Sequence, residues 1–211
     1  MVFLGTLYQA VGRADGRETL ERGLARLQEA GDEYGATTAM GNLSHFALED
    51  GEFATAALLS EQVAARAREH GFELIEAMAT CNQAVALVHE DDPLAGATAF
   101  SALRLCARTN MHFWIGTCLF VVAAAIAAED PRRAAVLLGA AEVELQGARK
   151  DSAETALYEN ATKAVRAALG STAFEQSMEE GRVLGRDAAV ELALHSSDER
   201  ARSVGGTVRL S

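Results

Sequence analysis

The sequence has few of the residues that interrupt helices or build sheets. Only two prolines, Pro93 and Pro131, occur among 211 residues, and aromatic residues make up 6% of the chain. β-branched and aromatic residues are too scattered to form strand-like runs, whereas Ala, Leu, Glu and Arg, which favour helices, are abundant. These scarcities predict an all-α fold.

Cysteine is also scarce. The three cysteines, Cys81, Cys106 and Cys118, are odd in number, lie in apolar stretches and show no CxxC spacing. This pattern argues against a disulfide framework and against a zinc site. We therefore expect three small buried thiols, no metal and no cofactor, in a protein of the reducing cytoplasm.

No segment has the length and composition of a membrane helix or a signal peptide. The uncharged run 113–128 is shorter than the ~20 residues that span a bilayer, and an acidic Glu129-Asp130-Pro131 corner ends it. Residues 2–7 are apolar, but the run is short and no basic residues precede it. We expect a cytoplasmic protein that does not associate with membranes.

Acidic residues outnumber cationic residues in the sequence. The chain has 19 Lys and Arg against 30 Asp and Glu, a formal net charge of −11, and its cations are scattered along the sequence. Such a chain repels phosphate backbones and has no basic stripe to overcome that repulsion. We expect no direct binding of nucleic acid by this segment.

A repeated plan of paired helices runs through residues 1–150. Each pair consists of two segments with helical apolar spacing, joined at a short corner. The corner residues Asp15, Asp50, Asp92 and Asp130 are 35, 42 and 38 residues apart, close to the period of tetratricopeptide repeats. The predicted pairs are 1–11 with 18–30, 34–48 with 53–70, 73–89 with 94–109, and 113–128 with 132–148.

The chemistry of these helices agrees with their spacing. Three of the second helices begin with small residues, which let the two helices of a hairpin approach closely. They are Ala54, Ala56 and Ala57, then Ala95, Gly96 and Ala97, then Ala134 and Ala135. The segment 113–128 is apolar all round, which predicts a helix buried on every side. We predict a tetratricopeptide-like helical-hairpin solenoid of four hairpins over residues 1–150.

The period changes after residue 150. A helix over 152–169 ends at Gly170, a capping box formed by Thr172 and Glu175 is expected to open another helix, and 187–194 forms a short last helix. We interpret residues 151–195 as atypical C-terminal capping helices that seal the array. The polar residues 196–211 have too little apolar area to offset ordering and are expected to form a flexible tail.

The C-terminal part resembles a known family. LLGAAE at 137–142, YENATKAVRAALG at 158–170, AFEQSMEEGR at 173–182 and AAVELAL at 188–194 resemble the helical-repeat region of bacterial LuxR- and MalT-type signal-transduction ATPase regulators. The resemblance implies a sensor or scaffold arm of a transcriptional regulator, with ATPase and DNA-binding activity in other domains. The chain itself has no GxxxxGK[ST] loop and no helix-turn-helix after residue 194.

Helical arrays usually bind through the first helices of their pairs, which line the concave side. Placing the corners in register predicts an apolar groove for a protein or peptide partner, a small effector, or another part of the same chain. The predicted groove residues are Thr38, His45, Glu49, Cys81, Val85, His89 and Leu119. The alternative is that the array closes tightly and that these are core residues.

A metal- or ligand-dependent enzyme is the alternative function. His45 and Glu49 lie four residues apart on one helix face, and His89 could approach them from the neighbouring helix. No Ser/His/Asp ordering or paired-acid signature accompanies them. We therefore expect a non-enzymatic binding module.

The apolar N-terminal residues suggest self-association. Val2, Phe3, Leu4 and Leu7 precede the first corner, and no polar capping helix shields them. An uncapped end exposes apolar area. This feature predicts a possible homodimer formed through the first helices.

Overall fold

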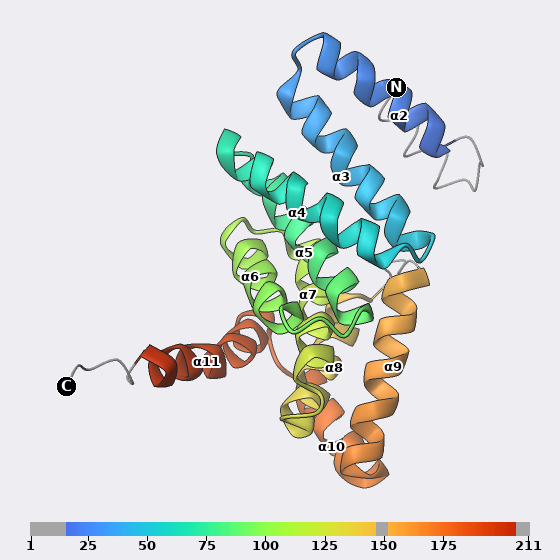
Figure 1. Ribbon diagram of the computed structural model, residues 1–211. Coiled ribbons are helices and arrows are strands. Elements are labelled where there is room, and N and C mark those ends of the chain that lie inside the picture. The colour runs from blue at the N-terminus through green and yellow to red at the C-terminus, as the bar shows by residue number, and fades with distance from the viewer. Residues whose placement is uncertain (1–15, 147–151, 206–211) are drawn as a thin grey trace, which may run out of the picture.

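The computed structural model describes residues 16–146 and 152–205 (Figure 1). Within these ranges the regular elements are helices and no strand occurs, which confirms the all-α class. No helix in the same ranges combines the length and apolar character needed to cross a bilayer. The helices are α2 (Gly16–Glu29), α3 (Glu33–Glu49), α4 (Phe53–His70), α5 (Glu73–His89), α6 (Ala95–Arg108), α7 (His112–Ile126), α8 (Pro131–Glu144), α9 (Ser152–Leu169), α10 (Ser171–Arg182) and α11 (Arg186–Gly205).

Local chemistry at the corners sets most of these boundaries. The side chain of Asp32 accepts a hydrogen bond from the backbone N–H of Gly35 and caps α3. Asp130 caps α8 in the same way, and Pro131 occupies the first turn, where its missing N–H costs nothing. Gly71 ends α4 with a left-handed φ of 71°. The predicted bounds of α4, α5 and α9 are confirmed to the residue.

Two features of the C-terminal region differ from the sequence analysis. Helix α10 begins at Ser171 directly after Gly170, whose φ of 76° turns the chain, and the N-cap makes no side-chain hydrogen bond. The predicted capping box of Thr172 and Glu175 is therefore wrong. Helix α11 also continues to Gly205, beyond the predicted end at residue 194, through a segment rich in helix-forming Glu, Arg and Ala.

Through α8 the helices pack in chain order. From α2 to α8 each helix contacts the next one along the chain, and α3, α5 and α7 also contact one another in turn. Figure 1 shows this succession from α2 to α8. We call the side on which α3, α5 and α7 meet the inner side.

The main hydrophobic core is centred on α7. Leu119, Phe120, Val121 and Val122 are fully buried, which confirms the prediction that this helix is covered all round. Among the small residues at the start of the second helices, Ala56, Ala95, Ala134 and Ala135 are buried, whereas Ala54 and Ala97 are exposed.

The last three helices pack differently from the pairs before them. Helix α9 contacts α3, α5, α7 and α8, whereas α10 packs mainly against α8 and α11 against α6, α7 and α8. The Arg133 guanidinium holds α11 by donating hydrogen bonds to the carbonyl oxygens of Leu192 and Ala193 at 3.1 and 2.5 Å. The chain-ordered packing that runs from α2 to α8 is therefore not continued by α9, α10 and α11.

Candidate binding site

The N-terminal end of α9 is bonded to the inner side. Ser152 Oγ donates a hydrogen bond to the backbone oxygen of Glu49, at the end of α3, over 3.3 Å. The His89 Nε2 atom, at the end of α5, lies 3.0 Å from the backbone oxygen of Ala153. The first turn of α9 thus joins the C-terminal ends of two first helices.

Further along its length, α9 packs against α7. Thr117 Oγ1 donates a hydrogen bond to Glu154 Oε1 over 3.2 Å, and the rings of Phe120 and Tyr158 meet edge to face with centroids 5.9 Å apart. Burial, and then the charge of Glu142, raise the pKa of the Tyr158 hydroxyl. Because α9 packs on α3, α5 and α7 together, part of the same chain fills space on the inner side.

Three of the predicted groove residues belong to the core. Cys81 and Leu119 are 0% exposed and Val85 is 2% exposed. Thr38 is half-buried, and its hydroxyl donates to the backbone oxygen of Tyr34 within α3. Cys81, Val85 and Leu119 therefore match the alternative that these are core residues, because side chains that are at most 2% exposed cannot line an open groove.

Of the three residues of the alternative enzyme, His45 and Glu49 lie beside each other, whereas the His89 ring is engaged by other residues. His45 Nε2 lies 3.9 Å from Glu49 Oε1 on the surface of α3. The His89 ring instead stacks on Phe53, with centroids 4.0 Å apart, and its Nε2 faces Ala153. Among residues 16–146 and 152–205, no group of three His, Cys, Asp or Glu side chains is arranged to hold a metal ion.

The three thiols, by contrast, meet in the core. Cys118 Sγ lies 3.6 Å from Cys81 Sγ and 3.7 Å from Cys106 Sγ, so α5, α6 and α7 each contribute one buried free cysteine. Hydrogen bonding with the Cys106 sulfur and then with the Cys81 sulfur, together with burial, raises the pKa of the Cys118 thiol well above its usual range. The burial predicted for these side chains is confirmed.

This cluster predicts a fall in stability at alkaline pH. Above about pH 8.5 the Cys118 thiol loses its proton in the unfolded chain but keeps it in the folded protein, so the free energy of unfolding decreases as pH rises. The slope contributed by one such group approaches roughly 1.4 kcal/mol per pH unit. Urea unfolding between pH 7 and 10 should show a shallower decline for Cys118→Ala than for the unaltered protein, and parallel declines would contradict this assignment.

The residues predicted to mediate self-association, Val2, Phe3, Leu4 and Leu7, lie outside the described residues. The homodimer stays a prediction.

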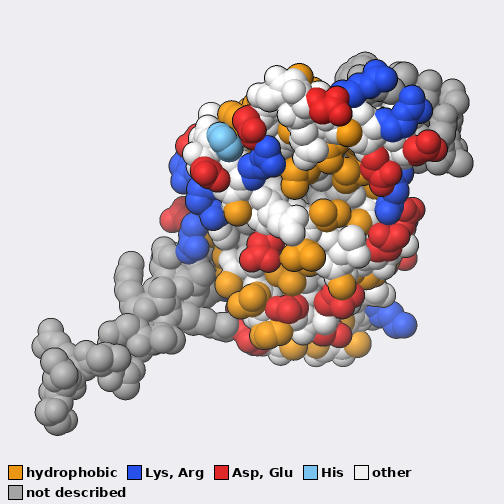
Figure 2. Space-filling view, turned by 45° about the horizontal axis from the view of Figure 1, so that its top comes forward, with side chains coloured by type: hydrophobic (Ala, Val, Ile, Leu, Met, Phe, Trp, Pro, Cys, Tyr) orange, Lys and Arg blue, Asp and Glu red, His pale blue; other side chains and the backbone are white. Residues whose placement is uncertain are grey.

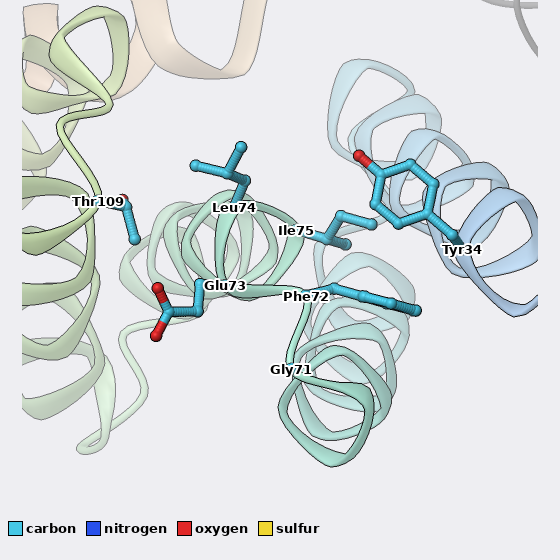
Figure 3. Close-up of a pocket in the computed structure, with 7 residues that line it drawn as sticks. All are labelled: Tyr34, Gly71, Phe72, Glu73, Leu74, Ile75 and Thr109. Carbon is cyan, nitrogen blue, oxygen red and sulfur yellow. The ribbon is translucent and has the colours of Figure 1, made fainter.

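A pocket of about 390 Å³, which we call the edge pocket, opens beside the first turns of α3 and α5, away from the predicted groove residues (Figure 3). Tyr34 comes from the first turn of α3, and Leu74 and Ile75 from the first turn of α5. Because Gly71 has a left-handed φ, the chain turns sharply between α4 and α5 and places Phe72 beside the pocket. Figure 3 shows Ile75 and Tyr34 extending toward one another from α5 and α3.

Large apolar side chains of this pocket are exposed. Tyr34 is 55% exposed and Leu74 is 53% exposed. The Tyr34 ring meets the Phe72 ring edge-on, with centroids 5.1 Å apart, and His70 stacks on Phe72 at 5.5 Å. The rings therefore support one another and form an apolar surface that is open to a ligand.

Charged pairs border this apolar surface. Glu33 forms an ion pair with Arg66 and lies 3.7 Å from His70 Nε2. Arg108 lies 3.8 Å from Glu73 on the α5 side. On the face that Figure 2 shows, hydrophobic side chains lie exposed among charges of both signs. An apolar centre with a polar rim is the usual anatomy of a protein–protein contact.

The sequence analysis missed this pocket because it placed binding on helix faces. Tyr34, Phe72 and Leu74 lie at corners or in first turns, where an apolar residue is not needed to complete a helix stripe. Aromatic and leucine residues at two corners of the same edge were the available signal. No known protein family, curated protein or solved structure matches the chain.

Proposed function

We propose that this chain is a tetratricopeptide-like helical-hairpin array that acts as a non-enzymatic binding module. The chain-ordered packing from α2 to α8 and the corner spacing support the array. The resemblance of its C-terminal part supports a role as the sensor or scaffold arm of a cytoplasmic bacterial transcriptional regulator. The partner in this proposal is another protein, which supplies an apolar segment.

The observation that carries the proposal is the apolar surface formed by the exposed side chains of Tyr34 and Leu74 and the half-buried ring of Phe72. Helix α9 already fills space on the inner side, whereas the edge pocket brings two exposed apolar side chains, Tyr34 and Leu74, together at one site. Covering the exposed half of Leu74 or of Tyr34 would stabilise a complex by about 1 kcal/mol each. Aromatic side chains with low conformational freedom also make good anchors at the centre of an interface.

A library of short linear peptides displayed on phage, selected against the full chain, tests this function. We expect enriched peptides with an aromatic or aliphatic anchor, and we expect Leu74→Asp to weaken their binding roughly tenfold or more, because the carboxylate would be desolvated against the anchor. The measurement is calorimetric titration with a synthesised copy of the selected peptide.

Leu58→Asp is the matched control. Leu58 on α4 is 56% exposed, nearly the same as Leu74, but it does not line the pocket. Its substitution should leave the peptide affinity unchanged. Equal loss in the two variants, no loss in Leu74→Asp, or no enrichment of any peptide would remove the edge pocket as the binding site.

A further inference from the structure

We propose that a second cavity binds a small organic cation with an apolar body. This cavity has a volume of about 840 Å³ and is lined by the α5–α6 corner, the C-terminal end of α7, and α6 and α9. It is separate in its residues from the edge pocket, and the inference does not depend on peptide binding there.

The size and the walls of this cavity suit a small molecule. Its volume lies within the roughly 300–1,000 Å³ typical of small-molecule sites. Phe100 and Val88 supply half-buried apolar surface, and Ala164 and Ala168 of α9 supply exposed methyl groups. Small side chains on α9 and at the end of α7 leave the space open. The walls therefore favour a ligand with a bulky apolar body.

The charges at this cavity favour a cation over an anion. Three carboxylates, those of Asp91, Asp92 and Glu129, and one guanidinium, that of Arg104, line it. The chain as a whole has a net charge of −11, so its long-range field also attracts cations. Asp92 is half-buried, and a charge held against apolar walls is less screened than one in open water, whereas Asp91 and Glu129 are exposed.

The corner that bears two of the carboxylates is fixed by its own hydrogen bonds. The backbone N–H of Asp92 donates to the carbonyl oxygen of Leu87 over 3.0 Å, and Asp92 Oδ1 accepts from the backbone N–H of Leu94 over 2.8 Å. Asp91 has a left-handed φ of 51°. The Asp92 carboxylate and the backbone of Asp91 are therefore placed before a ligand arrives, which lowers the entropic cost of binding.

Tetraphenylphosphonium and tetraphenylborate test the proposal, because they have nearly the same shape and opposite charges. Calorimetric titration of the full chain should show saturable binding of tetraphenylphosphonium and at least roughly tenfold weaker binding of tetraphenylborate. The double variant Asp91→Asn and Asp92→Asn should weaken the binding of tetraphenylphosphonium roughly tenfold. Asparagine tolerates the left-handed φ and keeps an acceptor for Leu94, so the corner should be preserved.

Two further variants make the result decisive. Ala164→Phe should fill the cavity and abolish phosphonium binding while the circular dichroism spectrum stays unchanged. Glu73→Gln, which removes an exposed carboxylate at the edge pocket, should leave phosphonium binding unchanged. Equal binding of the two ions, no saturable phosphonium binding, or equal effects of the Glu73 and Asp91/Asp92 substitutions would overturn the proposal and leave peptide binding at the edge pocket unaffected.

Discussion

Replacing Gly139 by alanine should lower the free energy of unfolding by about 3 kcal/mol, because it forces overpacking between two helix backbones. A Cβ atom at Gly139 would lie 2.1 Å from the carbonyl oxygen of Met178 on α10. Gly181→Ala should have a similar effect, since its Cβ would lie 1.9 Å from the carbonyl oxygen of Val136 on α8. Neither backbone can yield unless α8 and α10 move apart.

Thermal unfolding is the measurement. For a chain of this size, about 3 kcal/mol corresponds to a decrease in Tm of roughly 6–12 °C. Gly96→Ala is the control, because Gly96 lies in the first turn of α6 and nothing is within 4 Å of its added Cβ. That substitution should leave the Tm unchanged or raise it slightly. Wild-type Tm values for Gly139→Ala and Gly181→Ala would show that α8 and α10 do not approach in this way.

Phe120→Ala is expected to have the largest effect of any single truncation, with a loss of about 4 kcal/mol in the free energy of unfolding. Phe120 is fully buried in α7, and its ring contacts Tyr158 of α9. Removing it leaves a cavity and withdraws the aromatic contact between the two helices. Equilibrium unfolding in urea measures the loss.

Tyr34→Ala provides the comparison for Phe120→Ala. Tyr34 is 55% exposed at the edge pocket, so its truncation should lower the free energy of unfolding by less than about 1 kcal/mol. The same substitution should weaken the binding of the selected peptide. The two substitutions thus separate an aromatic residue of the core from one at the proposed binding site. A small loss for Phe120→Ala, or a loss for Tyr34→Ala as large as that for Phe120→Ala, would reverse this assignment.

The helix boundaries were predictable because the signals that set them are local. Gly71 follows a long helical stripe, and Asp130 with Pro131 combines a cap with a first-turn proline. These signals need no knowledge of distant contacts. The start of α10 was mispredicted because Gly170 supplied a turn that made the Thr172 and Glu175 side chains unnecessary as caps.

The contact between the thiols of Cys81 and Cys118 could have been predicted from the sequence. Cys81 and Cys118 are 37 residues apart, and the buried hydrogen bond from Asn82 to Ser44 spans 38 residues. Both separations are close to the corner spacing, so residues about one corner spacing apart meet where α3 touches α5 and where α5 touches α7. The contact between Thr117 and Glu154 again spans 37 residues, which shows that α9 follows α7 at the same interval.

The position of α9 on the inner side could not be predicted from the apolar faces of the individual helices. The sequence analysis allowed another part of the chain as an occupant of the predicted groove, but the pattern of Ala153, Leu157, Ala161 and Val165 defines only one apolar stripe. That stripe does not say which surface it covers. The choice depends on contacts with α3, α5 and α7, which are distant in sequence and become visible only in the folded chain.

The packing of α9 on the inner side is the claim on which the binding assignment depends, because it directs a partner to the edge pocket. Nuclear Overhauser effects between the aromatic protons of Phe120 and Tyr158 measure it directly in solution. Rings with centroids 5.9 Å apart in an edge-to-face arrangement should give clear cross-peaks between assigned ring protons. If Tyr158 shows no cross-peak to Phe120 or to any other α7 side chain, α9 does not lie there and the account is contradicted.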